Sequence, residues 1–92
     1  MEIRGIMIEP TDQVITVCAP AAPGDKVVFY TGEEQCTLHP LEEVPIYHKI
    51  ACAQIRKGEL VRKYGQPIGT ALKDIRIGEW VHTHNLVSTS LL

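Results

Sequence analysis

The sequence lacks any strong excess of charge of one sign. Nine Lys and Arg oppose eleven Asp and Glu, the formal net charge is −2, and the basic residues are spread along the chain. Proteins that bind nucleic acid usually carry a strongly basic surface. We therefore expect no nucleic-acid partner.

Long apolar runs are also missing. The N-terminal segment MEIRGIMIEP already contains charged residues at Glu2 and Arg4. A membrane-spanning helix needs about 20 mainly apolar residues in a row, and a secretory signal needs an uninterrupted apolar stretch. We expect neither a signal peptide nor a membrane span.

Cysteine is scarce and forms no CxxC pair. The three cysteines, Cys18, Cys36 and Cys52, are odd in number. Disulfides accumulate in oxidising compartments, whereas free thiols are typical of the reducing cytoplasm. We expect free, mostly buried cysteines in a cytoplasmic protein.

Six prolines spread over the chain exclude a long helix, because proline interrupts helical hydrogen bonding. The remaining segments are rich in β-branched and small apolar residues and are punctuated by turn residues, which favours short strands. We expect residues 1–92 to form one compact, mostly-β domain. It would contain at most one or two short helical turns, around residues 70–76, and a long exposed loop at 31–45.

An internal repeat gives the clearest structural signal. Residues 51–61 and 71–81 both fit A-x-x-x-I-R-x-G-E-x-V, and residues 17–27 form a weaker copy. This pattern predicts a strand, a turn and a second strand, with the glycine providing the bend. The acid after the glycine either accepts hydrogen bonds from turn amides or is simply solvated.

Two histidines stand close together in WVHTHN, residues 80–85. If this segment is a strand, Trp80, His82 and His84 share one face, and the two imidazoles lie roughly 6.6 Å apart. Such a pair can bind a metal ion but needs further ligands, which no other cluster in the chain clearly supplies. An ordinary polar strand face is the alternative.

Two further clusters carry polar side chains. His48 and Lys49 would point to opposite faces of a strand, and RKYGQPIG at 62–69 forms a tight loop that presents Lys63 and Tyr64. The spacings of phosphate-binding glycine loops are absent, and no Ser or Cys stands in a nucleophile context. Surface pairing and a solvated strand edge explain these residues equally well.

A long segment closely resembles the N-terminal module of the altronate and galactarate dehydratases, namely VPIYHKIACAQIRKGELVRKYGQPIGTALKDIRIGEWVHTHNL at 44–86. The matching motifs are HKIA at 48–51, KYG at 63–65, IG at 68–69 and VHTHN at 81–85. The resemblance covers about residues 11–87. It implies an SAF-type module with a β-clip fold, in agreement with the repeated turn unit.

The resemblance also implies a function. Members of this family are hydro-lyases that act on sugar acids with a divalent metal such as Fe²⁺ or Mn²⁺. In single-chain dehydratases a much larger domain follows this module, whereas the related sulfolactate sulfo-lyase has a small subunit of this type. Because this chain stops at Leu92, we expect a small subunit that acts with a separate large subunit, with a metal that the two can share, and that can also self-associate.

Site residues follow from the same resemblance. It implies catalytic roles for His48, Lys49 and Lys63, substrate contacts for Tyr64 and Asn85, and metal ligation by His82 and His84. The alternatives are a small subunit of (2R)-sulfolactate sulfo-lyase, or a non-catalytic β-clip module that binds carbohydrate or assists assembly. Tyr47 departs from the family pattern, because a smaller residue is expected immediately before the His-Lys pair.

Overall fold

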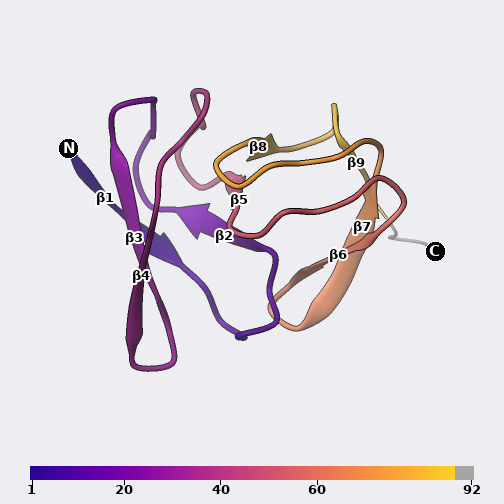
Figure 1. Ribbon diagram of the computed structural model, residues 1–92, viewed down its shortest axis with the longest axis horizontal. Helices are drawn as coiled ribbons and strands as arrows, with labels where there is room; N and C mark the ends of the chain where they lie inside the picture. Colours follow the sequence, from indigo (N-terminus) through magenta and orange to yellow (C-terminus); the bar gives the residue numbers. More distant parts are fainter. Residues whose placement is uncertain (89–92) are drawn as a thin grey trace.

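Nine short strands make up the fold of residues 1–88, the part of the chain that the computed structural model describes (Figure 1). Their bounds are β1 (Glu2–Ile6), β2 (Val14–Val17), β3 (Lys26–Thr31), β4 (Glu34–Leu38), β5 (Lys49–Ala51), β6 (Leu60–Lys63), β7 (Gln66–Ala71), β8 (Trp80–Val81) and β9 (Leu86–Ser88). The prediction of a mostly-β fold is confirmed.

The predicted helical turn at 70–76 is wrong, since no helix occurs among the described residues. The start of this segment belongs to β7, where Gly69, Thr70 and Ala71 pair with β9. Its end is held by Ile75, which forms an isolated bridge with Ile55. Pairing with distant segments therefore overrides the local helix preference of TALKDIR.

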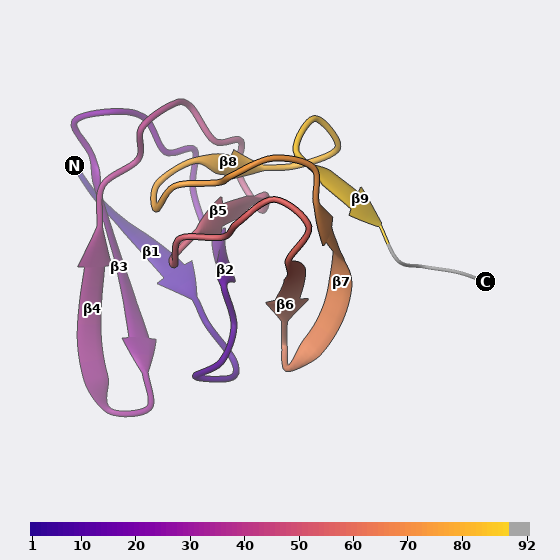
Figure 2. The same cartoon turned by 45° about the vertical axis from the view of Figure 1, so that its right-hand side comes forward.

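The strands form two sheets. One has the order β4-β3-β1-β2-β5-β8, in which only β1 and β3 are parallel, and the other has the order β6-β7-β9. In Figures 1 and 2 the β3–β4 and β6–β7 hairpins stand on opposite sides of β2 and β5. Two clusters of buried side chains fill the interior, one around Ile15, Val27 and Ile50 and the other around Ile55, Val61 and Val81.

The predicted long loop at 31–45 is also wrong over its first half. Residues 34–38 form β4, which pairs with β3 through a two-residue turn at Gly32 and Glu33. Gly32 has a φ of 66°, a conformation that glycine adopts readily in a two-residue hairpin. The strand escaped prediction because, of EQCTL, only Leu38 is buried, so the hydrophobic alternation is missing.

The repeated unit is a tight turn whose acid caps its own backbone, as predicted. Asp25, Glu59 and Glu79 each accept a hydrogen bond from the backbone N–H three residues earlier, at 2.9, 2.6 and 2.6 Å. The glycine before each acid has a positive φ, between 87° and 99°. One strand leads into each turn and another leads out, but these two strands are not hydrogen-bonded partners of each other.

A fourth copy of the turn occupies residues 44–48. Val44 bridges Ala21 of the first copy, as Ile55 of the third copy bridges Ile75 of the fourth position in the chain. Tyr47 stands at the glycine position with a φ of 67°, and His48 stands at the position of the acid. The described chain therefore carries four turns in two bridged pairs.

The three cysteines are free, as predicted, although each is only partly buried. The Cys52 thiol donates a hydrogen bond to the Asp12 carbonyl at 3.5 Å, and burial raises its pKa to about 12. A thiol with so high a pKa stays protonated and unreactive at neutral pH. Within residues 1–88 no helix has the length and apolar character needed to cross a membrane.

Candidate functional site

The WVHTHN segment is a turn rather than a strand, so the predicted extended pairing of its histidines is wrong. Strand β8 ends at Val81, and the chain then reverses. The Asn85 side chain causes this reversal, because its Oδ1 accepts from the His82 N–H at 2.9 Å and its Nδ2 donates to the Trp80 carbonyl at 2.8 Å. Asn85 is only 2% exposed. Its amide therefore fixes the turn, and its predicted contact with substrate stays a prediction.

The turn nevertheless gathers the histidines around one indole. The rings of Trp80 and His82 stack, with centroids 5.3 Å apart and an angle of 8° between their planes. His84 lies 5.2 Å from Trp80, and His48 lies 5.7 Å from Trp80 and 4.9 Å from His82. Residues from two distant segments thus form one cluster, which we call the His–Trp cluster (His48, Trp80, His82 and His84).

One hydrogen bond orders this cluster. The Trp80 indole Nε1–H donates to Nδ1 of His48 at 3.2 Å. The backbone N–H of Trp80 in turn donates to the Glu42 carboxylate at 3.1 Å. The ring of Trp80 also packs against the first core cluster, so the indole is held from several sides.

Two lysines add positive charge beside the cluster. Lys49 begins β5 and pairs with Val81 of β8. Burial, followed by repulsion from Lys63, lowers the pKa of Lys49. Burial, followed by the charges of His48, Lys49 and His84, lowers the pKa of His82. These couplings place both lysines within electrostatic range of the histidines, in a site that favours an anionic ligand.

Lys63 and Tyr64 lie at the tip of the β6–β7 hairpin. Tyr64 and Gly65 form its two-residue turn, with φ of 57° and 75°, and the Lys63 ammonium lies 4.8 Å from the centroid of the Tyr64 ring. The Asp12 carboxylate anchors this turn, since it accepts hydrogen bonds from the N–H groups of Tyr64 and Gly65 at 2.9 and 2.8 Å. The tip is therefore a shaped loop, as the sequence predicted.

Asp12 is one of the few buried polar side chains, at 4% exposure. Burial alone would raise the pKa of its carboxyl. Hydrogen bonds from the backbone N–H groups of Gly65, Glu9, Tyr64 and Ile8 more than offset this and lower the pKa below its ordinary value of 3.8. The carboxylate thus ties the 9–12 turn to the β6–β7 hairpin in its charged form.

The residues present fit one part of a metal site. Within residues 1–88 neither the His82 nor the His84 imidazole makes a protein hydrogen bond that would occupy its ring nitrogens, and such nitrogens are common ligands of divalent transition metals. No group of three or more His, Cys, Asp or Glu is arranged to hold a metal ion in that same part of the chain. Metal ligation by these two residues stays a prediction, and further ligands would have to come from outside it.

Three residues of the site went unassigned at the level of sequence: Trp80, Tyr47 and Pro45. Trp80 is the sole tryptophan and sits beside the paired histidines, which was the available signal. Tyr47 and Pro45 become meaningful only when residues 44–48 are recognised as a repeat copy. That copy is hidden because a tyrosine replaces its glycine and a histidine replaces its acid.

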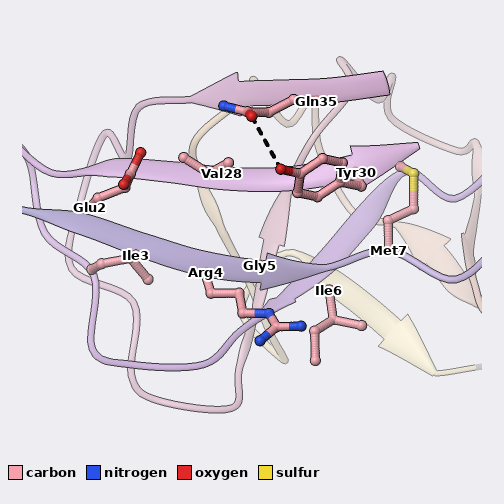
Figure 3. A pocket seen from close by; sticks show the side chains of 9 residues that line it. All are labelled: Glu2, Ile3, Arg4, Gly5, Ile6, Met7, Val28, Tyr30 and Gln35. Carbon is pink, nitrogen blue, oxygen red and sulfur yellow. Dashed lines mark hydrogen bonds between the residues drawn. The ribbon is translucent and has the colours of Figure 1, made fainter. Parts of the chain in front are cut away.

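A hollow elsewhere on the surface contains none of the predicted site residues. It lies along β1, β3 and β4 and is lined by Glu2, Ile3, Arg4, Gly5, Ile6, Met7, Val28, Tyr30 and Gln35 (Figure 3). The Tyr30 hydroxyl donates to the Gln35 side chain at 3.1 Å across it. With Arg4 as its one basic side chain, it lacks the grouped imidazoles and ammonium groups of the His–Trp cluster.

Comparison with known proteins gives consistent matches. The family model for the altronate/galactarate dehydratase SAF domain matches residues 3–89. The altronate dehydratase of Escherichia coli (strain K12) is 40% identical over 80 residues, which are 87% of this chain and 15% of that protein. The altronate dehydratase of Bacillus subtilis (strain 168) is 32% identical over the same shares of the two chains.

A second kind of relative has a similar length. The (2R)-sulfolactate sulfo-lyase subunit alpha of Chromohalobacter salexigens is 42% identical over 89 residues, which are 94% of this chain and 95% of that subunit. The chain thus spans about 15% of the length of the altronate dehydratases that it matches. It spans nearly the whole of the sulfo-lyase subunit.

Proposed function

This chain belongs to the family of altronate/galactarate dehydratase SAF domains, and from that premise we propose that it is the small subunit of a lyase. In this proposal it acts with a separate large subunit and helps to eliminate water from a sugar acid. The observation that carries the proposal is the His–Trp cluster with Lys49 beside it. Three imidazoles and a lysine of lowered pKa next to one another are a costly arrangement for a surface without a ligand.

The chemistry of a β-elimination accounts for these residue types. Removing the proton next to a carboxylate builds negative charge on the substrate, and the leaving hydroxyl needs a hydrogen-bond or proton donor. Lys49 and Lys63 suit the substrate carboxylate, and Tyr64 at the hairpin tip suits a hydroxyl of the substrate. His48 suits the reacting atoms. A divalent metal, when bound, would supply Lewis acidity that stabilises the developing charge.

His82 and His84 are the residues of this chain that would hold such a metal. Both rings lie beside Trp80, and the positive charges around His82 lower its pKa. A lowered pKa keeps the imidazole neutral near pH 7, which is the state that ligates metals. Fe²⁺ and Mn²⁺ are the proposed ions, with the remaining ligands on the large subunit.

A small subunit of (2R)-sulfolactate sulfo-lyase is the second candidate. The observation in its favour is length, because the matching subunit alpha of Chromohalobacter salexigens is covered over 95%. The same cationic cluster would suit a substrate with a sulfonate as leaving group. A non-catalytic module that binds carbohydrate or assists assembly is the third reading, and it leaves the grouping of three histidines unexplained.

The proposal is tested by co-expressing this chain with a large subunit encoded beside it and purifying the complex. The complex is then assayed with altronate, galactarate and sulfolactate, with Fe²⁺ or Mn²⁺ added. Turnover of a sugar acid supports the proposal, and turnover of sulfolactate alone selects the second candidate. A chain that forms no complex and gives no turnover with any of the three contradicts both.

A further inference from the structure

We propose that Trp80 is a positioning residue that fixes the proton of the neutral His48 imidazole on Nε2. His48 then acts as a hydrogen-bond donor through Nε2, not as a metal ligand. This inference rests on the proposed function, because it narrows the role of His48 at the reacting atoms. It follows from a single contact and from the chemistry of the two rings.

The indole N–H of Trp80 can only donate a hydrogen bond, and a neutral imidazole has one donor and one acceptor nitrogen. The contact between Trp80 Nε1 and His48 Nδ1 measures 3.2 Å. Nδ1 must therefore be the bare nitrogen, and the ring proton lies on Nε2. A protonated Nδ1 would oppose two N–H groups and lose the bond.

The fold leaves the His48 ring free for this contact. In the three other turns, the side chain at the equivalent position caps the backbone N–H three residues earlier. In this turn that residue is Pro45, which has no N–H. The backbone bond of the turn is still made, from the His48 N–H to the Pro45 carbonyl at 3.1 Å. The side chain has no capping task and turns to Trp80 instead.

Trp80 is itself fixed firmly enough to orient a neighbour. Glu42 accepts from its backbone N–H, and its carbonyl accepts from Asn85. On another side the residue borders an apolar pocket that includes Val44 and Pro45, members of the same turn as His48. The positions of donor and acceptor are thus set by one local unit.

The consequence is a division of labour within the His–Trp cluster. A nitrogen that carries a proton has no free lone pair for a metal, so His48 offers an N–H to a substrate oxygen. No proton leaves His48 in this role, since a neutral imidazole would have to become an anion. His82 and His84 have no comparable partner among the described residues, and their nitrogens stay available for ligation.

Nuclear magnetic resonance on the full chain with ¹⁵N-labelled histidine tests the tautomer directly. At a pH where the rings are neutral, His48 should show a bare-type Nδ1 and a protonated-type Nε2, and the Trp80 indole proton should be shifted downfield. His84 serves as the internal control and should show the averaged shifts of a mixture. A protonated Nδ1 in wild-type His48 overturns the inference.

The variant Trp80→Phe keeps an aromatic ring but removes the N–H. In this variant the two His48 nitrogens should move towards the averaged shifts of free histidine, while the amide spectrum of the remaining chain is retained. Unchanged His48 shifts in a folded variant contradict the inference. Because this readout needs no turnover, it separates a failure of this inference from a failure of the proposed lyase function.

Kinetics of the complex give the second readout. Loss of one oriented hydrogen bond of about 1.4 kcal/mol corresponds to about a tenfold fall in rate. Trp80→Phe should therefore lower kcat about tenfold with little change in KM. A kcat equal to that of the wild type would overturn the positioning role.

Discussion

His48 and Glu79 occupy equivalent positions in two turns that share the same backbone hydrogen bond. Their N–H groups donate to the carbonyls of Pro45 and Arg76, respectively, at 3.1 Å in both cases. The Glu79 carboxylate also caps the Arg76 N–H at 2.6 Å, whereas a proline takes the place of that donor before His48. One turn therefore uses its fifth residue for stability, and the other has that residue available for a site.

Replacing Glu79 by alanine should lower the free energy of unfolding by about 1 kcal/mol, because the Arg76 N–H loses its acceptor. Urea unfolding followed by circular dichroism measures the loss. Glu43→Ala is the matched control, since Glu43 is exposed and makes no side-chain hydrogen bond or ion pair in the described structure. Its effect should stay within about 0.5 kcal/mol. Equal losses in the two variants would show that the cap contributes nothing.

Tyr47→Gly should raise the free energy of unfolding by about 0.5–1 kcal/mol. Tyr47 has a φ of 67°, which is unfavourable for a residue with a side chain and readily adopted by glycine. Its ring is 70% exposed, so little packing is lost. Tyr47→Ala keeps the unfavourable backbone and should give no gain. A gain of the same size in both variants would locate the effect in the ring instead of the backbone.

Gly58→Ala and Gly78→Ala separate backbone strain from steric overlap. The two glycines have similar φ, 87° and 96°. An added Cβ at residue 58 meets nothing within 4 Å, whereas at residue 78 it overlaps the His39 carbonyl oxygen and approaches Leu41. We expect a loss of about 1 kcal/mol for the first variant and a clearly larger loss for the second, measured by denaturant unfolding. Equal losses would contradict the packing of the 39–41 segment against this turn.

Asp12→Asn should destabilise the fold at neutral pH by roughly 1–3 kcal/mol, because an amide NH₂ then faces backbone donors. The pH dependence gives a sharper test. The pKa of the Asp12 carboxyl is lower in the folded chain than its ordinary value of 3.8. Its stabilisation is therefore complete above that value and is lost as the pH falls through the lower, folded pKa.

The measurement for Asp12 is thermal unfolding of the wild type and the variant between neutral pH and pH 2. The difference in stability between them should shrink only below pH 3.8, the ordinary value of the carboxyl. Glu33→Gln, at the exposed β3–β4 turn, is the charge-matched control and should follow the wild type. A difference that is constant over the whole range would mean that the Asp12 carboxylate is not stabilised by its backbone donors.

The sequence predicted the parts of the fold that depend on local turn chemistry. The Gly-acid turns at 58–59 and 78–79 and the shaped tip at Lys63 and Tyr64 were read correctly, because glycine and its neighbours determine such turns within a few residues. The strand β4 and the end of β7 were misread, because their pairing depends on partners far away in the chain.

The candidate site was predicted as a set of residues but not as an arrangement. The expected strand through His82 and His84 ends at Val81, because the buried Asn85 amide caps a turn that no periodicity reveals. The contact between Trp80 and His48 joins segments 32 residues apart. Only the structure brings such segments together, whereas the residue types themselves were visible in the HxHN and His-Lys motifs.

The central claim is that the His–Trp cluster is the part of this chain that serves the reaction, and the double variant His82→Ala/His84→Ala tests it most directly. The variant should fold with wild-type stability, since neither imidazole makes a hydrogen bond within residues 1–88, and it should still bind the large subunit. We predict that turnover of the purified complex falls at least about 100-fold, as expected when ligands of a catalytic metal are removed. Turnover equal to that of the wild-type complex would contradict the account.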